Sequence, residues 1–197
     1  MLRTLSVLAL AFLAGCTAEP APAPPPPPRS TLQLAPPSSS APAVDVPQVS
    51  SPLEVGKFDK EPCAVLTAAQ ARAVHKLVKS ELGQGTTDLP ACQWRDDHLN
   101  GVRITFARGG GLRDTYTNQR PGTGYFEPTT LAGYPAVYAG KADQRQLGRC
   151  SLTVGVRNDE IMTVESDLGS SFSPSSRGSC EAVKKAAEAA IVTIKKG

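Results

Sequence analysis

A proline-rich tract divides this chain of 197 residues into a part that cannot build a core and a part that can. Residues 17–57 hold twelve of the eighteen prolines, five of them consecutive at 24–28, and have almost no aromatic or periodic apolar content. Such a segment buries too little surface to offset the entropy of ordering it. We therefore expect a disordered tether there and one folded domain in residues 58–197. A docking ligand of the PxxP type or a stalk that threads a cell wall are alternative interpretations of the tether.

A short apolar segment that ends at a cysteine precedes the tract. This segment, residues 5–13, is much shorter than the roughly 20 residues of a membrane-spanning helix. With Arg3 before it, the segment is typical of a secretory signal peptide, here residues 1–15. The motif Leu13-Ala14-Gly15-Cys16 is similar to the lipobox of bacterial lipoproteins, in which the cysteine thiol accepts a diacylglyceryl group. The sequence thus predicts a lipid anchor on Cys16 and a location on the outer face of the cell membrane. An ordinary signal peptide that happens to end at a cysteine is the alternative.

Four further cysteines lie in the predicted domain, at Cys63, Cys92, Cys150 and Cys180. An even number of cysteines in an exported chain indicates two disulfides. The spacings of about thirty residues or more, without a CxxC motif, argue against a zinc site or a redox pair. Cys63 and Cys180 each precede a predicted helix, and Cys92 and Cys150 each begin a predicted strand. This likeness of position favours the pairs Cys63–Cys180 and Cys92–Cys150, with the neighbour pairs Cys63–Cys92 and Cys150–Cys180 as the alternative.

Two helices are predicted at the two ends of the domain. The first begins with a capping box, in which Thr67 is the N-cap and Gln70 the third helical residue, and it ends at Gly83. Its apolar face would consist of Ala71, Val74, Val78 and Leu82. The second helix begins near Ser179 and continues to Lys196 with a narrow apolar stripe suited to packing on a sheet. The stripe consists of Val183, Ala186, Ala187, Ala190, Ile191 and Ile194. A helix that lies on a membrane surface is the alternative for this last segment.

The chain between the helices has the alternation of β-strands. Residues 102–107 alternate between apolar and polar side chains, and Asn100-Gly101 before them predicts a hairpin with residues 93–95. Residues 150–157 alternate in the same way and are predicted to form a second hairpin with residues 161–165. A short strand at 134–138 completes a set of about five. The order of helix, strands and helix predicts an α+β fold, with an antiparallel sheet covered on one face by the N-terminal and C-terminal helices.

The longest irregular stretch of the predicted domain is residues 107–132. Long loops within compact domains are often functional. The candidate binding surface on this stretch consists of Arg113, Tyr116, Arg120, Tyr125 and Phe126. A loop that merely covers the core is the alternative interpretation.

No arrangement of catalytic or metal-binding residues stands out in the sequence. His75 is predicted to be a solvated helix residue. Asp96-Asp97-His98 is interpreted as a polar turn, although its oxygen and imidazole groups could bind a metal. Gly109-Gly110-Gly111, between Arg108 and Arg113, could cradle an anion, but no phosphate-loop lysine follows and a flexible connection is favoured. We expect no catalytic residue, no metal and no cofactor.

Several motifs of the chain together resemble a known family. They are FDKEPCAVLT at 58–67, CQW at 92–94, LAGYPA at 131–136, CSLTV at 150–154 and the cysteine at 180. This set is similar to an actinobacterial lipoprotein family catalogued as domain of unknown function 3558, over nearly all of residues 55–195 and the lipobox. The resemblance implies a high-GC Gram-positive host and an outer-face location. It implies no established activity, and it supplies no catalytic residues.

The charge of the chain adds one exclusion. Loss of Arg3 with the signal peptide would leave twenty basic residues (21 less one) against eighteen acidic ones, with no basic stripe, so nucleic acid is not an expected partner. We expect a non-enzymatic cell-envelope lipoprotein that is held to the membrane by its lipid and binds an envelope protein or a cell-wall ligand. A sensor or accessory domain of a membrane system, by analogy of layout alone, and a hydrolase of envelope polymers are the alternatives.

Overall fold

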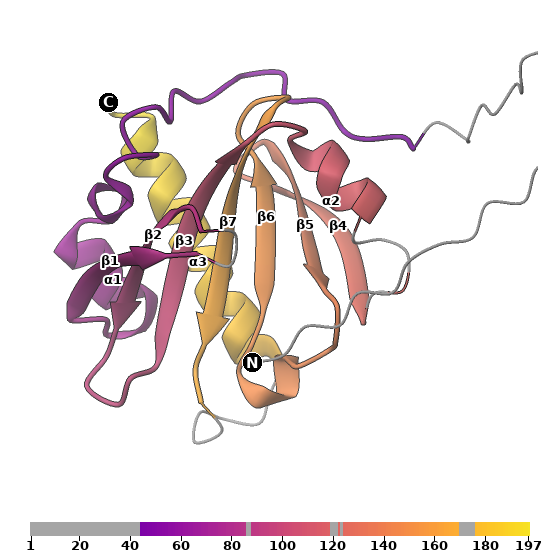
Figure 1. Ribbon diagram of the computed structural model, residues 1–197. Coiled ribbons are helices and arrows are strands. Elements are labelled where there is room, and N and C mark those ends of the chain that lie inside the picture. The colour runs from indigo at the N-terminus through magenta and orange to yellow at the C-terminus, as the bar shows by residue number, and fades with distance from the viewer. Residues whose placement is uncertain (1–43, 86–87, 119–121, 123, 170–175) are drawn as a thin grey trace, which may run out of the picture. The chain divides into compact units, whose positions relative to one another are not determined.

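Among the residues that the structure describes, 44–85, 88–118, 122, 124–169 and 176–197, seven strands form one antiparallel sheet (Figure 1). The structure is a computed structural model. Its strands are β1 Lys79–Gln84, β2 Pro90–Arg95, β3 Gly101–Arg108, β4 Tyr125–Leu131, β5 Tyr134–Gly140, β6 Ser151–Gly155 and β7 Glu160–Asp167. Its helices are α1 Ala68–His75, α2 Leu112–Asn118 and α3 Ser176–Ile194, with 3₁₀ turns η1 Pro62–Val65 and η2 Arg145–Leu147. The predicted α+β class is confirmed, but the prediction of about five strands was wrong. The predicted signal peptide, Cys16 and tether residues 16–43 lie outside the described residues.

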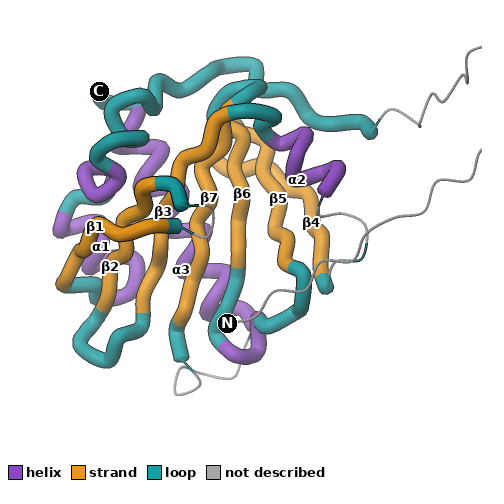
Figure 2. The backbone as a smooth tube through the Cα atoms, viewed as in Figure 1, coloured by secondary structure: helices purple, strands orange, loops and turns teal. Residues whose placement is uncertain are grey.

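The chain fills the sheet from its two edges toward the middle. The sheet order is β1-β2-β3-β7-β6-β5-β4, so the first three strands follow one another from one edge and the last four return from the other. The segment between β3 and β4, which includes α2, makes the crossing. β7 then completes the sheet by pairing with β3 from Gly101↔Asp167 to Arg108↔Glu160. Figure 2 shows β3, β7, β6 and β5 side by side at the centre. Both predicted hairpins, now β2–β3 and β6–β7, are confirmed.

The two strands that the sequence did not predict are the two edges. Every residue of β1 is exposed, and β4 is exposed from Glu127 to Thr130, so neither has a clear alternation of apolar and polar residues. β4 also contains Pro128, which an edge strand tolerates because one side of its backbone needs no hydrogen-bond donor. Edge strands therefore lack the alternation on which a sequence prediction depends.

The first helix is shorter than predicted. Its capping box is confirmed, since Gln70 N–H donates to Thr67 Oγ1 and Thr67 N–H donates to Gln70 Oε1. The helix ends at His75, because Lys76 adopts a left-handed conformation with φ of 53°. Val78 N–H then donates to Arg95 O, and the chain continues as β1. Val78 and Leu82, which were predicted to face the core from this helix, are instead exposed. Pairing with β2 thus outweighs the helical spacing.

The C-terminal helix is confirmed with its apolar stripe. All six residues predicted for the stripe are buried. α3 packs against β7, β6 and β3 on one face of the sheet, and α1 packs against α3. Gln70 Nε2 of α1 donates to Ala189 O and Thr193 Oγ1 of α3, which joins the two helices. Small alanine side chains allow the helix to lie close to the strands beneath it.

The opposite face of the sheet is covered in part by α2. Along β5, Ala136 belongs to the main core beneath α3, whereas Val137 and Ala139 form a second cluster with Leu112 and Tyr116 of α2. Successive residues of a strand point to opposite faces, so α2 lies on the face away from α3. The sheet is therefore covered on both faces, and not on one as the sequence predicted.

The disulfides join neighbours in the sequence. Cys63 pairs with Cys92, and Cys150 pairs with Cys180, with Cα–Cα distances of 4.9 and 5.2 Å. The favoured prediction, Cys63–Cys180 with Cys92–Cys150, was wrong. Cys92 lies on β2 and Cys150 directly precedes β6, and three strand spacings between these strands amount to about 14 Å. A disulfide requires Cα atoms less than about 7 Å apart, so the sheet order excludes that pair.

The folded unit begins before the boundary predicted at residue 58. Val49, Leu53 and Val55 are buried in the main core. Leu53 N–H donates to Val156 O, and Val49 N–H donates to Asn158 Oδ1 at the end of the β6–β7 hairpin. Residues 49–57, predicted as tether, are therefore part of the domain. Prolines at 47 and 52 gave this segment the composition of a tether, although its valines and leucine alternate with polar residues.

Candidate functional site

An open cleft lies at one end of the sheet, the lower end in Figure 1. Here β3, β4 and β6 begin and β5 and β7 end. The cleft has a volume of about 460 Å³, within the range of about 300–1,000 Å³ that is usual for ligand pockets. Its charged lining residues are Arg103, Lys141, Arg149, Glu165 and Asp167. Its uncharged polar lining includes Gln93, Tyr125, Gln144, Ser151 and Ser166.

The floor of the cleft is the sheet face away from α3. Arg103 lies between Val102 and Ile104, and Glu165 lies next to Val164, and these apolar neighbours are all fully buried in the main core. Because side chains alternate between faces, Arg103 and Glu165 point to the opposite face. The pairing Arg103↔Glu165 places them side by side on β3 and β7. The polar floor is thus a direct result of the strand alternation.

The ion pairs in the cleft are loose. Arg103 Nη1 lies 3.9 Å from Glu165 Oε2, and Arg149 Nε lies 3.6 Å from Asp167 Oδ1. The exposed fractions of the four side chains range from 32% to 60%. Exposed pairs of this kind stabilise a fold by only about 0–1 kcal/mol. Either arginine could therefore exchange its present partner for an anionic group of a ligand at a small cost in free energy.

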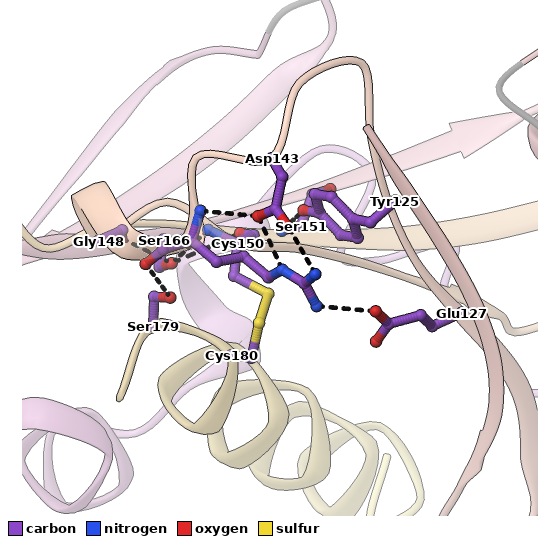
Figure 3. The surroundings of a disulfide bond; sticks show 10 residues. Tyr125, Glu127, Asp143, Gly148, Cys150, Ser151, Ser166, Ser179 and Cys180 are labelled. Atoms are coloured by element: carbon purple, nitrogen blue, oxygen red, sulfur yellow. Dashed lines mark hydrogen bonds and ion pairs between the residues drawn. A yellow bond between two sulfur atoms is a disulfide. The ribbon is translucent and has the colours of Figure 1, made fainter. Parts of the chain in front are cut away.

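One wall of the cleft, residues 141–149, is held by Arg145. Its guanidinium donates from Nε and Nη2 to the two carboxylate oxygens of Asp143 at 2.9 and 2.6 Å, and from Nη1 to Glu127 Oε1 at 2.9 Å. The hydrogen bonds from Arg145 lower the pKa of Asp143, and the same carboxylate raises the pKa of Arg145. A bidentate arginine–carboxylate contact fixes the relative orientation of the two side chains better than a single hydrogen bond. Figure 3 shows Asp143 and Glu127 on two sides of this contact.

Tyr125 fills the space beneath Arg145. The Arg145 guanidinium lies 4.5 Å from the centre of the Tyr125 ring, in a cation–π contact. The Tyr125 hydroxyl oxygen accepts from Ser151 N–H at 3.0 Å (Figure 3), and burial raises the pKa of this phenol. Tyr125 lies opposite Gly140, where a Cβ atom would be only 2.5 Å from the ring. Glycine at position 140 is therefore required for the tyrosine to lie flat against the strand.

The same wall is tied to α3. The disulfide Cys150–Cys180 joins the start of β6 to the first turns of α3, and Ser179 Oγ donates to Arg145 O at 3.3 Å. Cys150 N–H donates to Ser166 Oγ, which in turn donates to Gly148 O (Figure 3). Covalent and hydrogen-bonded supports of this kind hold a site in one geometry before a ligand arrives.

The predicted binding surface at 107–132 is mostly a packing unit. Tyr116 of α2 is buried and meets Phe126 edge to face at 5.0 Å between ring centres. Arg113 is exposed on α2, and Arg120 lies outside the described residues. Of the four predicted residues that the structure describes, Tyr125 alone lines the cleft. The stretch 107–132, which the sequence predicts to be irregular, contains α2 and β4, and these two elements pack the aromatic side chains.

The structure brings together cleft residues that the sequence analysis missed. They are Arg103, Lys141, Arg145, Arg149, Glu165 and Asp167. A signal for two of them was present, since Arg103 and Glu165 occupy the polar positions of alternating strands. Arg145, Arg149 and Lys141 lie in a segment without periodic pattern, and the signal for them exists only in three dimensions.

The other sequence candidates have structural roles. Asp96 Oδ1 accepts from the N–H groups of His98 and Asn100, and Asp96 Oδ2 accepts from Asn100 Nδ2, which closes the β2–β3 turn. The described residues contain no group of three or more His, Cys, Asp or Glu side chains placed to hold a metal. In the glycine segment, Gly110 N–H donates to Asp114 Oδ2 at 3.2 Å, so an anion from α2 already lies there.

The carboxylates of the cleft differ from those of a glycosidase. Glu165 and Asp167 are two residues apart on β7 and point to the same face. Acid and base in glycoside hydrolysis lie on opposite sides of the bond that breaks, and the acid needs a desolvated site. Here each carboxylate lies beside an arginine and is partly exposed. The arrangement therefore suits recognition of a polar ligand through both charges.

Comparisons with known proteins give one match. A family model described as "Protein of unknown function (DUF3558)" matches residues 11–193. No curated protein and no solved structure matches the chain. None of the helices within the described residues has both the length and the apolar character needed to cross a membrane.

Proposed function

The chain belongs to the DUF3558 family of proteins of unknown function, and on this premise we propose that it is a lipid-anchored cell-envelope protein whose domain binds a polar ligand in the cleft beside residues 141–149. The observation that carries the proposal is the cleft itself. It is large enough for a small ligand, one of its walls is cross-linked to α3, and two of its arginines have loosely held partners.

The lipid anchor in this proposal rests on the sequence. The motif that ends at Cys16 supports attachment to the outer face of the membrane, and the proline-rich tract supports a tether between the membrane and the domain. A domain held in this way would sample envelope components near the membrane, and a polar cleft would select hydrophilic ones.

The proposal can be tested by ligand capture from the cell envelope. The full chain, purified in detergent and immobilised, is incubated with the low-molecular-mass fraction of an envelope extract, and retained compounds are identified by mass spectrometry. Arg103→Gln removes a cleft arginine, whereas Arg113→Gln is a matched control at an exposed residue of α2 that does not line the cleft.

We expect a compound that is retained by the wild type and by Arg113→Gln and is lost with Arg103→Gln. Circular dichroism should give the same spectrum for all three proteins, since Arg103 has only a loose partner whose side chain is one third exposed. Equal retention by all three proteins, or no retained compound, would contradict the proposal.

A further inference from the structure

The cleft continues across the sheet toward β1. A second hollow of about 220 Å³ lies on β1, β2 and β3 and includes Glu81, Ala91 and Arg95 in its lining. Gln93 and Arg103 line both hollows, so the two are parts of one groove. The groove crosses β6, β7, β3, β2 and β1, which are consecutive in the sheet. Four spacings between five strands give it a length of about 19 Å. A ligand that fills it is a chain of several units.

Charged and amide side chains line both parts of the groove. Alternation places Ala91, Gln93 and Arg95 on the same face of β2, because Cys92 and Trp94 between them are buried in the core. The side chains that reach the groove carry guanidinium, amide and carboxylate groups, which both donate and accept hydrogen bonds. An extended peptide normally binds a sheet by adding along its edge, and its apolar side chains need pockets. This groove runs across the strands, and most of the described side chains that line it are charged or carry amides, so a polyhydroxylated chain suits it better than a peptide.

Positive charge is in excess along the groove. Its cations are Arg95, Arg103, Lys141 and Arg149, and its anions are Glu81, Glu165 and Asp167. Within the described residues, Lys141 forms no ion pair with a carboxylate, and Arg95 donates from Nη2 to the uncharged Gln93 Oε1 at 2.8 Å. Anionic groups on a ligand would give these cations charge-assisted hydrogen bonds, which are stronger than neutral ones.

From these observations, which rest on the proposed function of the cleft, we infer that the groove binds an acidic oligosaccharide that lies across the strands from residues 141–149 to β1. Arg103, at the junction of the two hollows, binds a carboxylate of the oligosaccharide in place of Glu165. The neutral hydroxyls of the chain bond to amide and carboxylate side chains on either side.

Calorimetric titration of the full chain in detergent tests the inference with defined probes. The probes are tetragalacturonic acid, its monomer galacturonic acid, and the neutral tetrasaccharide cellotetraose. We expect the acidic tetramer to bind at least about tenfold more tightly than the monomer or the neutral tetramer, because charge-assisted hydrogen bonds are stronger than neutral ones and the tetramer makes more of them. Similar affinity for all three probes, or no binding of the acidic tetramer, would overturn the inference.

Three variants assign the binding to the groove. Arg103→Gln should weaken binding of the acidic tetramer at least about tenfold, since a charge-assisted contact is lost. Glu165→Gln should tighten it, because a like charge beside the ligand carboxylate is removed, and Arg113→Gln should leave it unchanged. An Arg103→Gln affinity equal to that of the wild type would place the sugar elsewhere and refute the inference.

The two proposals fail in different ways. If an envelope compound is captured through Arg103 but the acidic tetramer does not bind, the cleft is a binding site and the inferred ligand class is wrong. If nothing is captured and no probe binds, both the function and the ligand class are refuted.

Discussion

Asp96 uses both of its carboxylate oxygens to close the turn between β2 and β3. Burial of Asp96 would raise its pKa, but hydrogen bonds from Asn100 and His98 outweigh this and lower the pKa below its ordinary value of 3.8. A carboxylate with a lowered pKa in the folded state stabilises the fold above its unfolded pKa, and this stabilisation is lost as the pH falls through the folded pKa. The turn is therefore a source of acid sensitivity.

Asp96→Asn should lower the free energy of unfolding at pH 7 by about 1–2 kcal/mol, because the amide replaces one charged acceptor. The difference from the wild type should shrink as the pH is lowered from 5 to 2, and urea titrations at several pH values measure it. Asp97→Asn is the control, since the Asp97 side chain is 77% exposed and forms a loose ion pair with Lys79 at 3.8 Å. A difference for Asp96→Asn that is as large at pH 2 as at pH 7 would show that the charge has no role.

At the scale of single residues, the sequence indicated the type of many groups but not their partners. The alternation around Arg103 and Glu165 placed them on a polar face, and their contact follows from the β3–β7 pairing. Arg145 gave no signal at all. Its carboxylate partners lie 2 and 18 positions away in the chain, and only the fold aligns them.

The turn between β4 and β5 holds a non-glycine residue, Ala132, in an unfavourable backbone conformation. Ala132 and Gly133 form a two-residue connection between Leu131 and Tyr134, and both have positive φ, 50° and 89°. This is the conformation of a type I′ turn, which favours Asn-Gly. An alanine in the left-handed region costs about 1–2 kcal/mol, whereas asparagine tolerates it better.

Ala132→Asn should therefore raise the free energy of unfolding by about 0.5–1 kcal/mol, as measured by urea or thermal unfolding. The side chain is exposed, so no packing contact is lost. Ala132→Val is the opposing control and should destabilise the fold, because a β-branched side chain fits the left-handed region poorly. If asparagine and valine shift the stability in the same direction, the turn conformation is not what decides the effect.

At the scale of elements, prediction succeeded where the sequence of an element by itself determines its secondary structure. α3 carries its periodic stripe and a long uninterrupted helical sequence, and the capping box of α1 was visible in four residues. Prediction failed where pairing with a neighbouring strand determines the secondary structure. The segment after His75 has helical spacing, but β2 supplies a row of free backbone groups, and the chain pairs with it as β1.

The whole molecule is held by two covalent links, one on each side of the sheet centre. Cys63–Cys92 joins η1 to β2, and Cys150–Cys180 joins β6 to α3, with sequence separations of 29 and 30. In the chain-entropy model each closed loop of this length stabilises the fold by roughly 3–4 kcal/mol. Removal of either link should therefore cost a similar amount of stability.

The two links should differ in their effect on ligand binding. The double variant Cys150→Ala with Cys180→Ala frees the wall of the cleft from α3, so ligand affinity should fall together with stability. Cys63→Ala with Cys92→Ala is the matched control and should lower only the free energy of unfolding, by up to about 3–4 kcal/mol. Calorimetric titration and urea unfolding of both variants measure the two effects. Equal losses of ligand affinity in the two double variants would show that the Cys150–Cys180 disulfide has no special role in holding the cleft.

Attachment of the whole protein to the membrane depends on one atom in the prediction, the thiol sulfur of Cys16. Cys16→Ser should move the protein from the membrane fraction to the soluble fraction, because no acyl chain can be attached to serine in this way. Fractionation of the producing cells, with the wild type as control, measures this. A variant that stays in the membrane fraction would refute the anchor at this position.

The sequence by itself determined the α+β class, the two hairpins, the last helix and the presence of an even set of cysteines in the domain. These features depend on local periodicity, turn residues and composition, which a chain carries whatever its neighbours do. The tertiary structure alone decided the edge strands, the pairing of the cysteines, the inclusion of residues 49–57 and the polar groove. Each of these depends on which strands become neighbours in the sheet, and that order is set by the burial of the whole core and not by any one segment.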